Sequence, residues 1–432
     1  MVYIKKYYNL AKDILFPICR SITGKGTVKT LKIIKKEFPK LKIIQVPTGT
    51  KVFDWKVPLE WEINDAYVLD KNNKKIINFK KNNLHVVGYS HPVNKNLKLK
   101  DLLKRIHSVP YLPKAIPYQH SYYKKYWGFC ATHEQKVKLK KDYNNKDSFK
   151  VVIKSKLKKG HLSYGELVIK GKSKEEILIS TYVCHPSMAN NELSGPIVSM
   201  SLIKHFQNRK NLKTLRFIFN PETIGAITYL SQNLKRLKEN VIGGFNLTCI
   251  GDERDHSCML TKYGNSTSDK ALLAAYKIKK IKFKIHSFLE RGSDERQYNS
   301  PGIDLPISSI FRSGYDRYKE YHTSLDDFKV VTEKGIKGGF EVAKTAIEIL
   351  QKKIIPRSVN LCEPMLSKRN LYRTLSGLTH HDIRGDFSRY LLHFLQYADG
   401  KNDLQDISRH IERNYSVTKK IYKILKKNKL VY

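Results

Sequence analysis

The chain has 432 residues and a formal net charge of +42, from 81 lysine and arginine residues against 39 aspartate and glutamate residues. This length predicts two or three domains, and 41% hydrophobic residues are enough to bury substantial cores, which excludes a disordered protein. No apolar run approaches the roughly 20 residues that cross a bilayer, so no membrane contact is expected, and the first residues lack a signal-peptide cleavage site. The six cysteines have no Cys-x-x-Cys spacing, which favours reduced thiols and a cytoplasmic location.

The positive charge has two interpretations. Electrostatics alone would attract nucleic acid or an anionic surface. The basic residues are mostly lysines spread over nearly every segment, and they do not form an arginine-rich stripe with exposed aromatics. We therefore favour a lysine-rich solvated surface and do not expect nucleic acid as a partner. An acidic or phosphorylated substrate is compatible with either interpretation.

Apolar periodicity predicts two N-terminal helices, at residues 8–19 and 28–38. The glycine-punctuated loop at residues 20–26 between them lacks the spacing of a phosphate-binding loop, so we interpret it as a helix connection. From residue 42 to about residue 131 the sequence changes to short β-like runs broken by Pro, Gly and Asn. This texture predicts a compact β-rich module.

Strands and helices alternate from about residue 149 to residue 351, which predicts an α/β fold. Nearly continuous apolar strands between amphipathic helices indicate a mostly parallel sheet with helices on both faces. Residues 387–432 have the pattern helix, short helix, helix, which is typical of a winged-helix domain. The predicted strands are Val151–Ile153, Leu167–Ile169, Ile177–Val183, Thr214–Phe219, Gly244–Cys249 and Leu305–Ile310.

A histidine follows one of these strands almost directly. His185 comes two residues after the strand at 177–183, and Ser194-Gly195 opens the next helix. In α/β enzymes, ligands bind where the carboxyl ends of parallel strands open onto a crevice. We therefore interpret His185 as a metal ligand or catalytic residue, the alternative being a buried structural histidine. The adjacent Cys184 ends a buried strand, so we assign it to the core rather than to nucleophilic catalysis.

Two more polar clusters follow the same layout. Glu222 lies between a predicted strand and a helix, where the helix dipole favours a carboxylate; a simple helix-terminal carboxylate is the alternative. His322 is followed by Asp326 and is a candidate ligand with a supporting acid, or else a solvated loop histidine. The predicted substrate-contacting residues, with a solvated loop as the alternative for the 291–298 segment, are Asp294, Glu295, Arg296 and Tyr321.

Several motifs, in a fixed order, carry a family resemblance. They are Pro47–Trp55, Leu84–Tyr89, Tyr126–Cys130, Thr181–Asn190, Pro221–Gly225, Gly292–Tyr298, Glu320–Asp326 and Tyr397–Gly400. With them the chain resembles, over essentially its whole length, the bacterial and archaeal polysaccharide-biosynthesis proteins with an aminopeptidase-like domain. The resemblance implies a zinc-exopeptidase-like α/β domain at residues 1–41 and 132–356, an inserted β-rich domain at 42–131, and a winged helix at 357–432.

More distantly, the core resembles co-catalytic zinc aminopeptidases, whose site pattern is His, bridging Asp, Glu-Glu, Asp, His. By that resemblance His185 and His322 are the two histidine ligands and Glu222 is the general base that activates the attacking water. Asn191 stands in place of the bridging Asp, and Thr223 in place of the second Glu.

The strand-end Asp of the zinc aminopeptidase pattern has no match, although Asp252 lies close to the expected position. Two dications need anionic ligands to offset their repulsion, so losing up to three carboxylates disfavours a two-zinc site. The expectation is one zinc ion on His185 and His322, with Asn191 and either Asp252 or Asp294 as further ligands.

The sequence therefore predicts a metal-dependent hydrolase linked to surface-polysaccharide biosynthesis, intact or degenerate. Its substrate would be a small amide-bearing molecule, either an acylated amino-sugar or a short peptide. The alternative is a non-catalytic binding or regulatory protein that uses the winged helix for DNA or protein contacts. Asn191 favours the alternative, whereas His185, Glu222 and His322 together favour the hydrolase. A homo-oligomer is an open alternative to a monomer.

Overall fold

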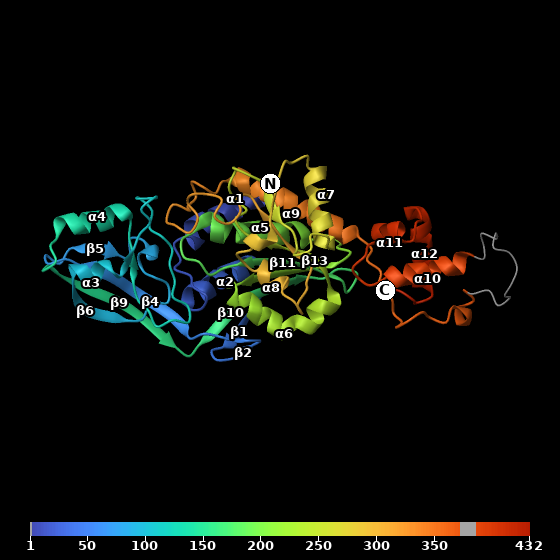
Figure 1. The fold of residues 1–432 in the computed structure, drawn as a ribbon, viewed down its shortest axis with the longest axis horizontal. Coiled ribbons are helices and arrows are strands. Elements are labelled where there is room, and N and C mark those ends of the chain that lie inside the picture. Colours follow the sequence, from blue (N-terminus) through green and yellow to red (C-terminus); the bar gives the residue numbers. More distant parts are fainter. Residues whose placement is uncertain (1, 372–385) are drawn as a thin grey trace.

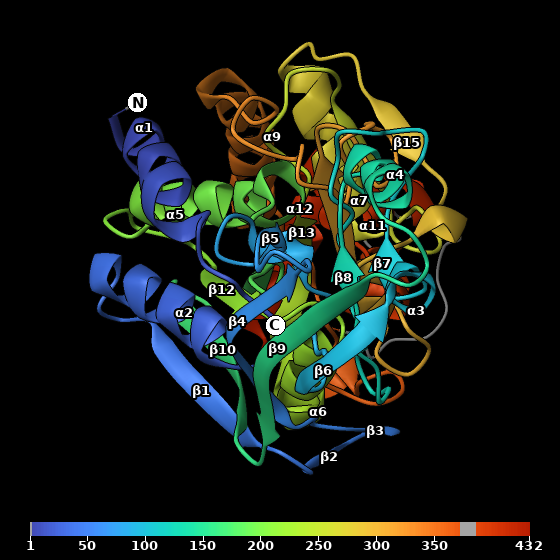
Figure 2. The same cartoon turned by 90° about the vertical axis from the view of Figure 1, so that its left-hand side faces the viewer.

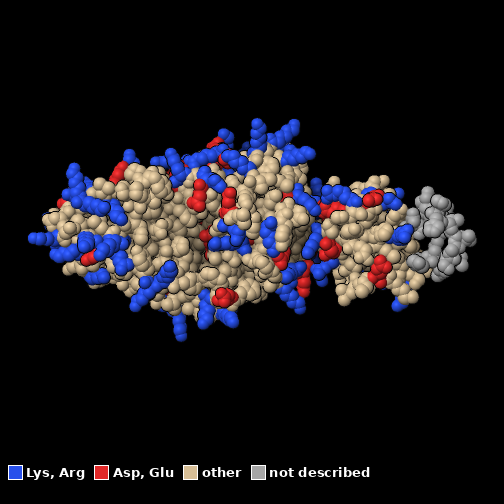
Figure 3. Space-filling view, in the orientation of Figure 1, with Lys and Arg blue, Asp and Glu red and all other residues tan. Residues whose placement is uncertain are grey.

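The computed structural model describes residues 2–371 and 386–432, which form an elongated molecule of three parts (Figure 1). An α/β domain lies at the centre, a β-rich module at one end and a helical C-terminal domain at the other. Figure 2 views the molecule from the end that the β-rich module occupies. Lysine and arginine side chains are spread over all three parts on the face that Figure 3 shows.

An eight-stranded sheet forms the α/β domain, in the order β1-β10-β12-β11-β13-β16-β14-β15. The four central strands β12, β11, β13 and β16 are parallel, and antiparallel pairs adjoin them on both sides. Every residue of β11, β12 and β16 is buried, which explains their nearly continuous apolar sequence. The bounds are β1 Lys42–Pro47, β10 His161–Ile169, β11 Glu176–Tyr182, β12 Thr214–Asn220, β13 Val241–Leu247, β14 Ser257–Met259, β15 Lys284–His286 and β16 Ile307–Phe311.

Helices cover both faces of this sheet, as predicted (Figure 1). One apolar core joins one face to α1, α2, α5, α7 and α9, and a second core joins the other face to α6. No helix in the described part of the chain is long and apolar enough to cross a membrane. The bounds are α1 Val2–Asn9, α2 Lys25–Glu37, α5 Ser194–Phe206, α6 Ile224–Asn240, α7 Thr267–Ile278, α8 Glu295–Tyr298 and α9 Glu333–Lys352.

The β-rich module is built on a four-stranded antiparallel sheet, in the order β5-β4-β9-β6. Its larger elements are β4 Glu60–Leu69, β5 Lys75–Asn78, β6 Val93–Lys98, β9 Ser148–Lys158, α3 Leu99–Leu103 and α4 His133–Asp142. Two short strand pairs accompany them: β2 Lys51–Val52 with β3 Trp55–Lys56, and β7 Ile106–His107 with β8 Phe129–Cys130.

Two strands lie in a different sheet from the one predicted. The sequence assigned Val151–Ile153 to the α/β sheet, but these residues are part of β9 in the module. It assigned residues 42–47 to the module, but they form β1, the edge strand of the main sheet. Outside its buried centre β9 alternates exposed and buried residues, the pattern of a sheet with one solvated face, and the short apolar run hid that alternation.

The C-terminal domain has the predicted order of helices, with its own apolar core. The helices are α10 Asp386–Tyr397, α11 Leu404–His410 and α12 Tyr415–Lys427. Ile421 and Leu425 of α12 are fully buried in this core, so the apolar stripe of α12 packs inside its own domain. Ion pairs Lys270–Asp406 and Lys353–Asp403 connect α11 and its N-cap to the α/β domain.

Gly195, in the first turn of α5, lets the helix start directly against β13. A Cβ at this position would lie 2.2 Å from the Leu247 carbonyl oxygen and 2.2 Å from the Thr181 hydroxyl. We expect Gly195→Ala to lower the free energy of unfolding by about 1–3 kcal/mol, the usual range for overpacking. Denaturant unfolding measures this, with Gly88→Ala as control because its Cβ would make contacts of 3.4 Å or more. Equal stability of the two variants would contradict tight packing at the start of α5.

Candidate functional site

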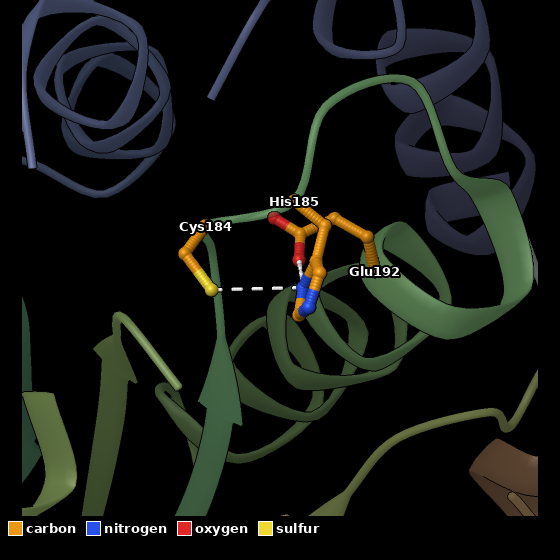
Figure 4. Close-up of side chains that lie close together, drawn as sticks. All are labelled: Cys184, His185 and Glu192. Atoms are coloured by element: carbon orange, nitrogen blue, oxygen red, sulfur yellow. Dashed lines mark hydrogen bonds and ion pairs between the residues drawn. The ribbon is translucent and has the colours of Figure 1, made fainter. Parts of the chain in front are cut away.

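Glu192 and Arg20 fix the orientation of the His185 ring. His185 is 4% exposed, and its Nδ1 lies 2.9 Å from Glu192 Oε2 (Figure 4). Arg20 Nε lies 3.0 Å from Glu192 Oε1 and also donates to the His185 carbonyl at 2.8 Å. Because a carboxylate accepts hydrogen bonds, Nδ1 carries the proton that faces Glu192. Nε2 is therefore the ring nitrogen available to another partner.

Glu222 lies beside that second nitrogen. Its Oε2 is 3.5 Å from His185 Nε2, and its Oε1 accepts a hydrogen bond of 2.5 Å from the Ser293 hydroxyl. The Glu222 side chain is 20% exposed, against 5% for His185, so solvent reaches Glu222 more readily than the ring. Burial raises the pKa of Glu222. Burial alone would lower the pKa of His185, but acidic groups around it, Cys184 and Tyr118 foremost, and its bond to Glu192 hold this pKa above the ordinary value. Without a metal ion the ring is therefore protonated, and an ion at Nε2 would have to displace the proton that faces Glu222.

His322 lies next to His185, with ring centroids 5.7 Å apart. Tyr321 stacks on His322 at 4.0 Å, and the edge of the site is closed by Tyr118, whose ring centroid is 5.4 Å from that of His322. Burial lowers the pKa of His322 to about 3, and repulsion from His185 and His120 adds to the effect. A neutral imidazole has a ring nitrogen free for a metal ion. The sequence expected these two histidines to converge, and the structure places them side by side.

The β-rich module contributes side chains that the sequence analysis missed. Tyr118 is in ring contact with His185 at 5.1 Å and donates its backbone N–H to the His322 carbonyl at 2.8 Å. Its hydroxyl lies 2.8 Å from that of Tyr122, on which His120 stacks at 3.9 Å. The aromatic cluster at residues 118–123 was a visible signal, but its contact with the site is long-range and leaves no trace in local sequence.

Asn191 is buried and offers an oxygen without a partner. Its backbone N–H donates to Asp326 Oδ2 at 2.9 Å, and its Nδ2 lies 3.9 Å from Cys249 Sγ. Within residues 2–371 and 386–432, no hydrogen bond reaches Asn191 Oδ1. Asp326 also accepts from Asn190 N–H at 2.7 Å, so this carboxylate shapes the turn before α5.

Asp252 lies in a different environment from the one predicted. Its carboxylate accepts the Ser313 N–H at 2.9 Å and the Ser313 hydroxyl at 2.5 Å, and the Arg254 N–H at 3.3 Å. These bonds tie the loop after β13 to the end of β16. Asp252 therefore has a structural partner at each oxygen, and we remove it from the candidate metal ligands.

Asp294 and Glu295 hold the site's loops rather than facing a substrate. Asp294 is fully buried and accepts the Thr223 N–H at 2.7 Å and the Asn220 amide at 2.8 Å. Burial raises the pKa of Asp294 to about 7. The five groups that bond to Glu295, which is 1% exposed, are the N–H groups of Gly292 and Ser293 and the side chains of Asn246, Ser309 and Tyr315.

Thr223 and Arg296 form the other border of the site. Thr223 has φ 61° and ψ −80°, an outlying conformation for a β-branched residue, and Asp294 holds its backbone there. Arg296 Nη2 donates to the Thr223 hydroxyl at 2.7 Å. In the described part of the chain Arg296 has no ion pair, and its Nε is buried without a partner. The assignment of Arg296 and Tyr321 to substrate contact stays a prediction.

Cys184 does not have the geometry of a nucleophile. Cys184, His185 and Glu192 lie close together, with ligand atoms within 4.8 Å of one another. Cys184 Sγ and Glu192 Oε2 both approach Nδ1 of His185, at 3.5 Å and 2.9 Å. A catalytic triad needs its nucleophile and its acid on opposite ring nitrogens. Burial also raises the pKa of Cys184 to about 11, so its assignment to the core stands.

Two family models divide the chain between them. Residues 8–353 match a domain of unknown function, DUF4910, and residues 354–432 match a winged helix-turn-helix family. A Clostridium acetobutylicum protein is 42% identical over 402 residues, which are 93% of this chain and 90% of that protein. Its name assigns it provisionally to polysaccharide biosynthesis and gives it an aminopeptidase-like domain.

Solved structures share the fold. A crystal structure from C. acetobutylicum, described provisionally as a peptidase, has a TM-score of 0.78 at 39% identity and matches 99% of this chain and 96% of its own. BSAP, a zinc aminopeptidase from Bacillus subtilis, has a TM-score of 0.60 at 12% identity over 81% of this chain and 94% of its own, a likeness of fold alone. The resemblance found in the sequence is confirmed: the chain belongs to the DUF4910 family of aminopeptidase-like proteins and ends in a winged helix-turn-helix domain.

Proposed function

We propose that this protein hydrolyses a small amide-bearing substrate with the help of one zinc ion held by His185 and His322. The observation that carries the proposal is the hydrogen bond between His185 Nδ1 and Glu192, which leaves Nε2, facing Glu222, as the nitrogen that a metal ion could take in exchange for a proton. Histidines that bind zinc almost always make such a bond through their other nitrogen. A zinc aminopeptidase with the same fold supports the choice of metal.

We infer that these residues suit one ion rather than two. Two neighbouring imidazoles and the unpartnered oxygen of Asn191 can serve a single cation. A second cation would need carboxylates, but position 191 carries a neutral amide and position 223 a hydroxyl. Arg296 donates a hydrogen bond to the Thr223 hydroxyl, and the positive charge of its guanidinium would repel a second cation there.

The proposal gives Glu222, Arg296 and Tyr321 separate roles in the reaction. His185 and His322 would hold the zinc ion, which would supply a Lewis acid for the amide carbonyl. Glu222, anchored by Ser293, takes the proton of the attacking water and returns it to the leaving nitrogen. Arg296 binds a carbonyl or carboxylate oxygen of the substrate, and the Tyr321 ring packs against its body.

An acylated amino-sugar and a short peptide both satisfy these requirements. The relative's provisional place in polysaccharide biosynthesis favours the amino-sugar. All six cysteines lie in the described residues and are free, which supports a cytoplasmic location.

Removing either histidine should abolish zinc binding. We expect about one zinc ion per chain in the unaltered protein. Removing only the hydrogen-bond partner of a ligand typically lowers metal affinity about 10–100-fold, so His185→Ala and His322→Ala, which remove a ligand itself, should lower zinc affinity further. Elemental analysis and calorimetric titration measure both quantities. His161→Ala is the control, because His161 is exposed and lies at the start of β10. Unchanged zinc binding in both site variants would contradict the proposal.

Asn191→Asp should raise zinc affinity by about tenfold or more, because a carboxylate adds a negative charge beside the cation. Asn190→Asp is the matched control, since it adds the same charge at a neighbouring buried position whose Oδ1 already accepts the Gly251 N–H at 2.8 Å. Calorimetric titration with zinc compares the two variants. If Asn191→Asp bound zinc no better than the control, position 191 would not face the metal.

The second candidate function is a non-catalytic regulator, and the winged helix-turn-helix match favours it. The exposed face of α12 carries five lysines but no Arg, Asn or Gln between residues 417 and 427. Lysines bind phosphates as point charges, whereas base edges are usually contacted by Arg, Asn or Gln. This helix therefore suits a docking or phosphate-contacting role better than sequence-specific DNA recognition.

DNA binding by the full chain should accordingly be weak and independent of sequence. At physiological salt we expect dissociation constants of about 10⁻⁴–10⁻⁶ M for both random and genomic duplexes. The affinity should fall steeply as the salt concentration rises. Fluorescence anisotropy measures this, and Lys419→Gln with Lys423→Gln should reduce the salt dependence. Nanomolar, sequence-selective binding would instead establish the regulator.

A further inference from the structure

A pocket apart from the candidate site is lined by residues that precede β14, follow α7, follow β16 and lie in the first half of α9. Its volume is about 420 Å³, within the range of small-molecule sites. None of the proposed zinc ligands lines it. Its most informative lining residues are His256, Arg312, Lys337 and Gly338.

Arg312 is a buried cation without an anionic partner. It is 7% exposed, and its Nε donates to the Asp255 carbonyl oxygen at 2.5 Å. Among the described residues it forms no ion pair, and its two terminal nitrogens have no hydrogen-bond acceptor. Three carboxylates act on Arg312 through space without forming an ion pair with it: Asp252, which is hydrogen-bonded to Ser313, Glu253, which pairs with Lys334, and Asp255, which pairs with Lys284. Two guanidinium nitrogens are thus free on a buried side chain that lines the pocket.

Gly338 makes the space that this guanidinium occupies. A Cβ on Gly338 would lie 2.0 Å from Arg312 Nη1 and 3.2 Å from His256 Cε1. Glycine inside a helix lowers the stability of the helix relative to alanine, and α9 has such a glycine at the place where the guanidinium lies. The fold therefore holds Arg312 in a fitted cradle rather than in a chance surface position.

The charges around the pocket do not cancel. Lys279 pairs with Glu341 at 2.7 Å, and Lys334 pairs with Glu253 at 2.7 Å. Arg312 and the exposed Lys337 have no such partner in the described ranges. The nearby Asp252 offsets part of their charge, so the lining keeps an excess of positive charge.

His256 adds one uncharged polar group to the pocket. Its Nδ1 is buried without a hydrogen-bond partner among residues 2–371 and 386–432. Burial, with repulsion from Arg312, lowers the pKa of His256 to about 4, so the ring is neutral and can donate one hydrogen bond.

We propose that this pocket binds the phosphate group of a small phosphorylated ligand, with Arg312 as its anchor and Lys337 and His256 as further contacts. A phosphate monoester carries close to two negative charges, which match the two unpaired cations. The planar fork of a guanidinium binds two phosphate oxygens at once. The volume leaves room for a small body, such as one sugar ring, next to the phosphate. The proposal does not depend on the hydrolase function.

The first test is calorimetric titration of the full chain, at constant ionic strength, with inorganic phosphate, glucose 6-phosphate and glucose. We expect both phosphate probes to bind and glucose not to bind. Tighter binding of glucose 6-phosphate would identify a phosphate ester as the occupant, and equal binding would identify free phosphate. Failure of both phosphate probes, or equal binding of glucose, would overturn the proposal.

The second test locates the binding. Arg312→Met should weaken phosphate binding by about tenfold or more, because it removes charge-assisted hydrogen bonds. Gly338→Ala should weaken it too, since its Cβ displaces the guanidinium. Lys337→Gln should weaken it more than Lys282→Gln, which removes the same charge from an exposed lysine outside the lining.

Thermal unfolding checks that each of these variants folds. If a buried variant fails to fold, the two exposed lysine variants still decide. Equal phosphate affinity of Lys337→Gln and Lys282→Gln, or unchanged affinity in folded Arg312→Met, would overturn the assignment.

Discussion

The fully buried ion pair between Arg20 and Glu192 is the interaction on which the site depends. Arg20 comes from the loop before α2, and Glu192 from the turn before α5, so the pair joins distant segments around His185. Burying two charges is unfavourable, and removing one partner of such a pair typically costs about 3–5 kcal/mol because the other is stranded. Here the pair fixes both the direction and the protonated nitrogen of a single imidazole, which is what a ligand or a base needs.

Some residues of the site could be predicted from the sequence, whereas others could not. The carboxyl ends of parallel strands meet at one edge of a sheet, so strand-end residues such as His185 and Glu222 were recognisable from sequence. The roles of Arg20 and Tyr118 were not, because they depend on contacts across more than 60 residues of chain. Carboxylates were the least predictable residues. Asp252 and Glu295 resemble ligands in sequence, but the N–H and hydroxyl groups that surround each one decide its function.

A shared fold does not imply shared chemistry in this protein. The sheet and helices match a zinc aminopeptidase, but a fold hosts many activities, and the groups at the site decide among them. In this chain one half of the site keeps two imidazoles, whereas the other half carries Asn191, Thr223 and a guanidinium. The strained Thr223 backbone shows that this second half is also tightly held. Tyr118, from the β-rich module, borders both histidines.

The central claim is that one zinc ion binds between His185 Nε2 and His322. Anomalous diffraction at the zinc edge, from crystals of the full chain equilibrated with zinc, tests it most directly. We predict a single peak about 2.0–2.1 Å from a nitrogen of each ring, with no density beside Thr223 and Arg296. Two peaks about 3.5–4 Å apart, or one peak on the Cys184 and Glu192 side of the ring, would contradict the account.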